Sequence, residues 1–118
     1  MKSHKDLDVW KAAVSVAKDT YRLTASFPKE EQFGMTSQMR RSSISIASNI
    51  AEGAARQGNK EFVRFLHIAL GSAAELETQI VIAREVGLGD DKAMEKLDQD
   101  LTQIRHVLQG LIRSLKAT

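Results

Sequence analysis

The chain has 118 residues, of which 42% are hydrophobic, and a formal net charge of +2 at pH 7. That length suits one domain, here residues 1–118, that buries roughly two thirds of its unfolded surface. The absence of cysteine excludes disulfides, thiolate nucleophiles and cysteine-based zinc sites. The start has no secretory signal pattern, and no apolar run approaches the roughly 20 residues of a membrane span. We therefore expect a soluble, cytoplasmic protein.

The first predicted helix covers about residues 7–26, in a composition dominated by good helix formers. Its end is predicted at Phe27-Pro28, because the residue before a proline avoids the α region. The expected apolar stripe of this helix consists of Trp10, Ala13, Val14, Ala17 and Tyr21.

The second and third helices are predicted over about 36–57 and 60–86. Gly58 is suited to end the second helix, and Asn59 is the expected N-cap of the third. The apolar face of the second helix is predicted to contain Met39, Ile46, Ile50 and Ala54. The predicted stripe of the third comprises Phe62, Leu66, Ala69, Ala73, Leu76, Ile80 and Ala83.

The fourth helix is predicted to follow Asp90 as its N-cap. Apolar residues recur in it at steps of four and three, which is a heptad pattern of the coiled-coil type; they are Met94, Leu97, Leu101, Ile104, Leu108, Leu111 and Leu115. Four amphipathic helices joined by short loops predict an all-α fold, an antiparallel up-down-up-down four-helix bundle.

A polar stripe runs along the second helix beside its apolar face, through Gln38, Ser42, Ser45, Asn49, Glu52 and Arg56. Antiparallel packing on the third helix makes the residue numbers of facing positions add up to about 116. Glu52 then lies level with Arg64, Asn49 with His67, and Arg40 and Arg41 with Glu75 to Glu77. We interpret this as a structural polar seam of ion pairs that fixes register, made by Arg40, Arg41, Asn49, Glu52, Arg64, Glu75 and Glu77. A ligand site at the same seam is the alternative.

The sequence contains no recognisable catalytic motif. Di-iron bundles need Glu-x-x-His, but Arg64 and Gln103 stand three residues before His67 and His106. Neither a P-loop nor a GxGxxG motif occurs. We expect His106 to be exposed and His67 to be near the seam. The chain is therefore predicted to be no enzyme and to hold no metal or cofactor.

Charge is distributed unevenly along the predicted bundle. One end holds nine basic and four acidic residues, a net charge of +5, and the other end has a net charge of −3. Such polarity is typical of a phosphate-facing surface, although helix dipoles favour the same arrangement in the fourth helix. The candidate nucleic-acid-binding residues are Lys2, Lys5, Lys11, Arg56, Lys60, Arg64, Arg113 and Lys116. We expect no aromatic stacking platform, since the aromatic residues fit core or helix-end positions.

An exposed strip of small and apolar residues is predicted on the third helix, opposite its core stripe. It contains Gly71, Thr78 and Ile82. Such a strip suits packing against another subunit. The alternative is an ordinary surface with no partner.

Three blocks carry a family resemblance: LDVWKAA (7–13), FPKEEQFGMTSQMRRSSISIASNIAEGAAR (27–56) and KEFVRFLHIALGSAAELETQI (60–80). Across residues 7–88 the chain resembles the bacterial four-helix-bundle proteins encoded in intervening sequences of 23S rRNA genes, also labelled ribosomal-protein-like. The last helix matches in pattern alone. Ser42-Ser43 and Ala47 depart from the family, in which small apolar residues and proline are frequent at these positions.

The resemblance implies a homo-oligomer, in known members a homopentamer, and a role in binding nucleic acid. The accessory protein of diversity-generating retroelements is similar in architecture, and there a basic surface serves a reverse transcriptase. The family has no agreed catalytic residues. Its signature falls on Arg40, Arg41, Asn49, Glu52, Gly53, Arg56, Phe62, Arg64, Phe65, Glu75 and Glu77.

We therefore expect a non-enzymatic, oligomeric bundle that binds RNA or DNA through clustered basic residues. The alternative is a protein–protein interaction adaptor or scaffold with no nucleic-acid role. Neither reading requires a membrane or a small-molecule substrate.

Overall fold

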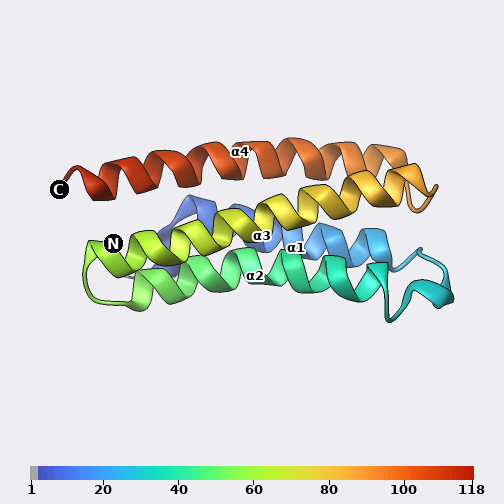
Figure 1. Ribbon diagram of the computed structural model, residues 1–118, viewed down its shortest axis with the longest axis horizontal. Coiled ribbons are helices and arrows are strands. Elements are labelled where there is room, and N and C mark those ends of the chain that lie inside the picture. The colour runs from blue at the N-terminus through green and yellow to red at the C-terminus, as the bar shows by residue number, and fades with distance from the viewer. Residues whose placement is uncertain (1–2) are drawn as a thin grey trace.

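The computed structural model describes residues 3–118, in which all regular elements are helices. Its elements are α1 (Asp8–Thr24), α2 (Met35–Ala55), α3 (Asn59–Glu85) and α4 (Asp91–Lys116), with 3-10 turns η1 (His4–Asp6) and η2 (Lys29–Glu31). The molecule measures 47 × 21 × 19 Å, and the 27 residues of α3 alone span about 40 Å. Each helix therefore runs back along the one before it (Figure 1). The predicted all-α fold is confirmed.

The helices pack in a closed ring. α1 and α3 each contact both α2 and α4, so that α1 and α3 lie on one diagonal of the bundle. The interface between α2 and α3 is the most extensive of the four. It also carries most of the residues that the sequence singled out.

The core follows the predicted stripes of α3 and α4 closely. All seven predicted positions of α3 are buried, as are those of α4 from Met94 to Leu108. Leu111 and Leu115 are only partly buried, and Ile112 is buried instead. Leu115 lies beside the start of α3, where it borders a groove with Lys60 and Val63.

The α1 stripe was predicted only in part, since Ala13 is buried and Trp10 packs against the core, but Val14 and Tyr21 do not. Val14 and Tyr21 are 42% and 41% exposed, whereas Val9, Val16 and Leu23 form the buried face. α1 carries apolar residues on two adjacent faces, and periodicity alone does not choose between them. The face with Tyr21 remains open to solvent beside α2.

Lys96 links α4 to α1. Its Nζ lies 2.8 Å from an Asp100 carboxylate oxygen and 3.3 Å from an oxygen of Asp19 in α1. The hydrogen bond to Asp100, and then the one to Asp19, raises the pKa of Lys96. The pair with Asp19 places the two helices in antiparallel register.

Asp90 is the N-cap that the sequence predicted, and its Oδ2 accepts a hydrogen bond from the Ala93 amide at 2.9 Å. Asn59 is not an N-cap, because Gly58, with φ of 90°, precedes a helix that already begins at Asn59. The Asn59 amide instead donates to the Leu115 carbonyl at 3.2 Å. Asn59 thus fastens the start of α3 to the end of α4.

α3 is long and apolar enough by length and composition to cross a membrane, with a mean hydropathy of 1.2 over its most apolar stretch, 44% of which is buried. The expectation that no segment could span a membrane rested on uninterrupted apolar runs, and polar residues interrupt the apolar ones in α3. The buried part of the stretch is the core stripe. The rest is an exposed apolar face, described below.

Candidate functional site

The register of α2 and α3 agrees with the prediction. Ser45 Oγ and Ser72 Oγ are 2.7 Å apart across the interface, within one residue of the expected alignment. The Asn49 side-chain amide donates to the Ser45 carbonyl at 2.8 Å and to Ser45 Oγ at 3.0 Å. A chain of small polar side chains therefore occupies the middle of the interface.

Gly53 brings the two helices together toward the end of α2. A Cβ at this position would lie 2.8 Å from Phe65 Cβ and 3.0 Å from Phe62 Cδ1. No side chain fits there without moving these neighbours. Gly53, Phe62 and Phe65, all in the family signature, thus form one tightly packed contact.

Arg56 and Arg64 both lie over the Phe65 ring, with their Cζ atoms 5.1 and 4.4 Å from its centroid. Arg56 pairs with Glu52 at 2.7 Å and Arg64 with Glu61 at 3.1 Å, each within its own helix. The hydrogen bond from Arg64 lowers the pKa of Glu61. The predicted pair of Glu52 with Arg64 is therefore wrong, because partners one turn away on the same helix are closer.

The predicted ion pairs at the other end of the seam are also wrong. Arg40 faces α1, where its Nε donates to Thr24 Oγ1 at 2.8 Å and its Cζ lies 4.4 Å from the Tyr21 ring centroid. Glu77 faces α4 and pairs with Arg105 at 3.5 Å. Antiparallel register fixes which residues are level, but it does not fix which way they point around each helix.

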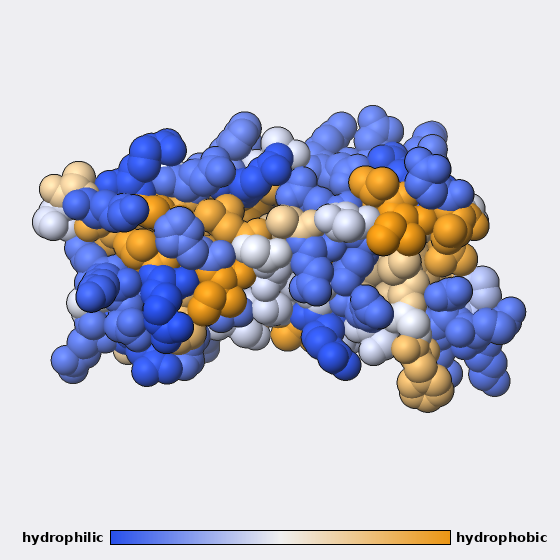
Figure 2. Space-filling view, viewed as in Figure 1, coloured by the Kyte–Doolittle hydropathy of each residue, from blue (hydrophilic) through white to orange (hydrophobic). Residues whose placement is uncertain are grey.

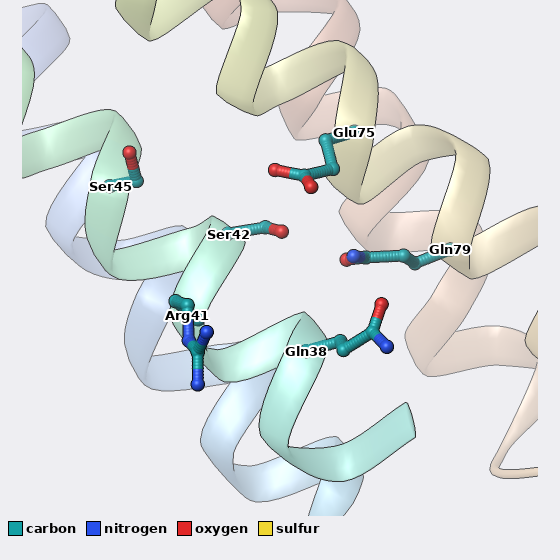
Figure 3. A pocket seen from close by; sticks show the side chains of 6 residues that line it. All are labelled: Gln38, Arg41, Ser42, Ser45, Glu75 and Gln79. Atoms are coloured by element: carbon teal, nitrogen blue, oxygen red, sulfur yellow. The ribbon is translucent and has the colours of Figure 1, made fainter. Parts of the chain in front are cut away.

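A polar cleft of about 290 Å³ opens between α2 and α3, lined by Gln38, Arg41, Ser42, Ser45, Glu75 and Gln79. In Figure 3 the Arg41 guanidinium points away from Glu75, so this predicted pair does not form. Gln79 is only 6% exposed, and its Oε1 has no hydrogen-bond partner. Sequence reasoning missed Gln79, since one glutamine on an apolar helix belongs to no motif.

The candidate nucleic-acid-binding residues gather at the opposite end of the bundle. Lys60, Arg113 and Lys116 are exposed, and within residues 3–118 none of them has a carboxylate partner. Lys60 and Lys116 border a groove of about 290 Å³ between the start of α3 and the end of α4. Lys5 and Lys11 are exposed as well, and Lys2 lies outside the described residues.

Exposed apolar residues gather on two surfaces of the part of the chain that is described. On the outer face of α3, Ile68, Val81 and Ile82 are 39%, 55% and 45% exposed, and Gly71 and Thr78 lie among them as predicted. We call this the α3 face. Figure 2 shows apolar atoms gathered in separate areas toward both ends of the visible surface, with polar atoms between them.

The second apolar surface, the α1–α2 edge, is a groove lined by Tyr21, Gln32, Phe33, Thr36, Ser37, Arg40, Arg41 and Ile44. Its volume is about 440 Å³. Phe33 is 90% exposed, so the expectation that all aromatic residues occupy core or helix-end positions is wrong. Phe33 lies in the loop between α1 and α2, where helical periodicity predicts nothing.

The histidines do not form a shared site. His67 and His106 are exposed, and the His4 ring packs edge-on to Trp10 at 5.0 Å. No hydrogen bond joins His67 to α2 in the part of the chain that is described. Among residues 3–118, no group of three or more His, Asp and Glu side chains is arranged to hold a metal ion.

Comparison with known families supplies a classification. The family model described as 23S rRNA-intervening sequence protein matches residues 5–110. The chain belongs to this family. No curated protein matches it.

The family also has a structural counterpart. The chain is similar to the crystal structure of a protein of unknown function from the S23 ribosomal protein family of Bacteroides thetaiotaomicron VPI-5482. The TM-score is 0.79 and the identity 26%, over 88% of this chain and 97% of that one. The resemblance of residues 7–88 to the family is therefore confirmed, and it extends into the fourth helix.

Proposed function

We propose that this family member is an oligomeric, non-enzymatic bundle that binds RNA or DNA through the basic end of the molecule. The observation that carries the proposal is the pair of exposed lysines, Lys60 and Lys116, at the groove between α3 and α4, together with the exposed Arg113 in the last turn of α4. Cations free of carboxylate partners remain available for phosphate, and phosphate contacts dominate affinity for nucleic acid.

Arg56 and Arg64 extend this basic surface onto α2 and α3. Their side chains are 47% and 56% exposed even though each has a carboxylate partner. A guanidinium has five N–H donors, so donors remain for a phosphate oxygen. The Phe65 ring holds both groups in place, which reduces the entropy lost on binding.

Oligomer formation is supported by the two separate apolar surfaces. The α3 face and the α1–α2 edge are on different helices, and α1 and α3 are on a diagonal of the bundle. Two different surfaces that meet head to tail produce a ring when the rotation closes. A ring, of five subunits by family resemblance, would present several basic ends together and so bind multivalently.

The second candidate function is a protein-interaction adaptor. The exposed Phe33 and the large groove at the α1–α2 edge favour it, because exposed aromatic groups commonly anchor protein partners. An adaptor would bind its partner with little dependence on salt.

Two charge reversals distinguish these functions. Lys60→Glu with Lys116→Glu alters the basic end, and Lys29→Glu with Lys92→Glu alters exposed lysines at the opposite end by the same net charge. We expect wild-type affinity for a generic RNA or duplex DNA, measured by fluorescence anisotropy, to fall steeply between about 50 and 200 mM salt. The first double variant should bind at least about tenfold more weakly, and the second should bind nearly as well as wild type. Absence of binding at low salt, or equal losses in both variants, would reject the proposal.

Light scattering tests the oligomer separately. Ile82→Lys places a charge on the α3 face, whereas Val107→Lys alters an exposed valine of α4 outside both apolar surfaces. We expect wild type and the Val107 variant to share a multimeric mass and the Ile82 variant to have a lower one. A monomeric wild type would contradict this part of the proposal.

A further inference from the structure

The cleft between α2 and α3 contains hydrogen-bond acceptors that lack donors. Gln79 is almost completely buried, and its Oε1 has no partner. Buried polar atoms are almost always hydrogen-bonded in native proteins. The unpaired oxygen is therefore an acceptor that is available to a donor from outside the chain.

The cleft is formed by two helical pairs that face each other. Gln38 and Ser42 are one turn apart on α2, and Glu75 and Gln79 are one turn apart on α3. Ser42 is short, which leaves space between the helices at this level. Figure 3 shows Ser42, Glu75 and Gln79 directed into that space.

The cleft favours a cation over an anion. Glu75 contributes a carboxylate, and no ion pair within residues 3–118 involves it. The nearest basic lining residue, Arg41, points away from the space (Figure 3). Carboxylate and amide oxygens accept hydrogen bonds, and a charged donor makes the strongest ones.

We propose that this cleft binds an organic cation through an ammonium or guanidinium group. The group donates to the Glu75 carboxylate and to Gln79 Oε1, with the Ser42 hydroxyl as a further acceptor. The site lies in the half of the α2–α3 interface away from Lys60 and Lys116, so the proposal does not depend on nucleic-acid binding.

Calorimetry with agmatine, which has a guanidinium at one end and an ammonium at the other, tests the proposal on the full chain. We expect saturable binding at one site per chain. The blocked peptide acetyl-Gly-Arg-Gly-amide distinguishes the source of the cation. Tighter binding of the peptide identifies an arginine side chain of a polypeptide, and tighter binding of agmatine identifies a free amine. If neither binds, the cleft holds water alone and the proposal is overturned.

Matched variants locate the site. Glu75→Gln should weaken agmatine binding by about tenfold or more, as expected for loss of a charged hydrogen bond. Glu85→Gln, which removes an exposed carboxylate from the same helix, should leave binding unchanged. Equal effects of the two changes would show general charge attraction and contradict a site.

Gln79→Met and Arg41→Gln separate binding from folding. Gln79→Met removes the unpaired oxygen, so we expect weaker agmatine binding with a Tm equal to or above that of wild type. Arg41→Gln removes a like charge from the mouth of the cleft, so binding should tighten. Unchanged affinity in Gln79→Met would remove this residue from the site and overturn the proposed geometry.

Discussion

The two halves of the α2–α3 interface differ sharply although the same helices form both. Near the end of α2, Gly53 packs against Phe62 and Phe65 with no room for a Cβ. Near its start, Ser42 faces Glu75 and Gln79 across an open cleft. One half is closed by a glycine that packs against two phenylalanines, and the other leaves a cleft lined by polar side chains.

The difference shows how a bundle can fix its register and keep a site. Close packing of glycine against large side chains leaves one favourable alignment of the helices. The other half can then retain polar side chains that are not optimised for stability. We expect changes at buried positions of the closed half to affect folding most and changes at exposed positions to affect it least.

Phe65→Ala should have the largest effect. Phe65 is 8% exposed and supports both Arg56 and Arg64, and loss of a buried phenylalanine costs about 3–5 kcal/mol. Urea unfolding measures this loss. Phe33→Ala, at a phenylalanine that is 90% exposed, should change stability by less than about 0.5 kcal/mol. Similar urea midpoints for the two variants would contradict the tight packing of Phe65 in the closed half.

Gly53→Ala and Gly71→Ala should change stability in opposite directions. The new Cβ at residue 53 would clash with Phe65, and overpacking costs about 1–3 kcal/mol. A Cβ at residue 71 has nothing within 4 Å, so helix propensity should raise stability there by about 0.5–1 kcal/mol. Thermal unfolding of both variants checks the signs. Stabilisation by Gly53→Ala would show that the helices are not in close contact there.

Ser72→Ala should have a smaller effect. It removes the hydrogen bond with Ser45 across the interface, which is worth about 0.5–1.5 kcal/mol. Ser48→Ala, at an exposed serine of α2, should be neutral or slightly stabilising. If the two alanine variants unfold at the same denaturant concentration, the hydroxyl contact contributes nothing.

Glu61→Gln should have the smallest effect, and the effect should depend on pH. The hydrogen bond from Arg64 lowers the pKa of Glu61 below its ordinary value of 4.5. The ionised carboxylate therefore stabilises the fold above that value, and the contribution disappears as the pH falls through the lowered pKa. Wild type should exceed the variant in Tm at pH 7, and the gap should shrink as the pH falls below 4.5. A difference in Tm that widens in acid would contradict the lowered pKa of Glu61.

Much of the fold follows from the sequence because two patterns are unambiguous. The α3 stripe from Phe62 to Ala83 has one apolar face dense enough to identify the core. The short connection around Gly58 then fixes the register with α2, which the contact between Ser45 and Ser72 confirms.

The seam was not predictable in detail because register does not determine direction. Arg40 reaches a hydroxyl of α1, and Glu77 reaches Arg105 of α4, although both are on helices that face each other. Their partners lie on α1 and α4. An alignment of α2 with α3 alone does not include these helices. The cleft could not be predicted either, because it depends on the directions in which Ser42 and Gln79 point from their helices.

The register of α2 and α3 underlies both the Gly53 contact and the polar cleft, and an engineered disulfide tests it directly. The chain has no cysteine, so Ser45→Cys with Ser72→Cys introduces one defined pair, and Ser48→Cys with Ser72→Cys is the control. We predict rapid intramolecular cross-linking of the first pair under mild oxidation, seen as a monomer with two thiols lost by mass spectrometry. Cross-linking of the control pair in preference to the first would contradict the alignment of the two helices.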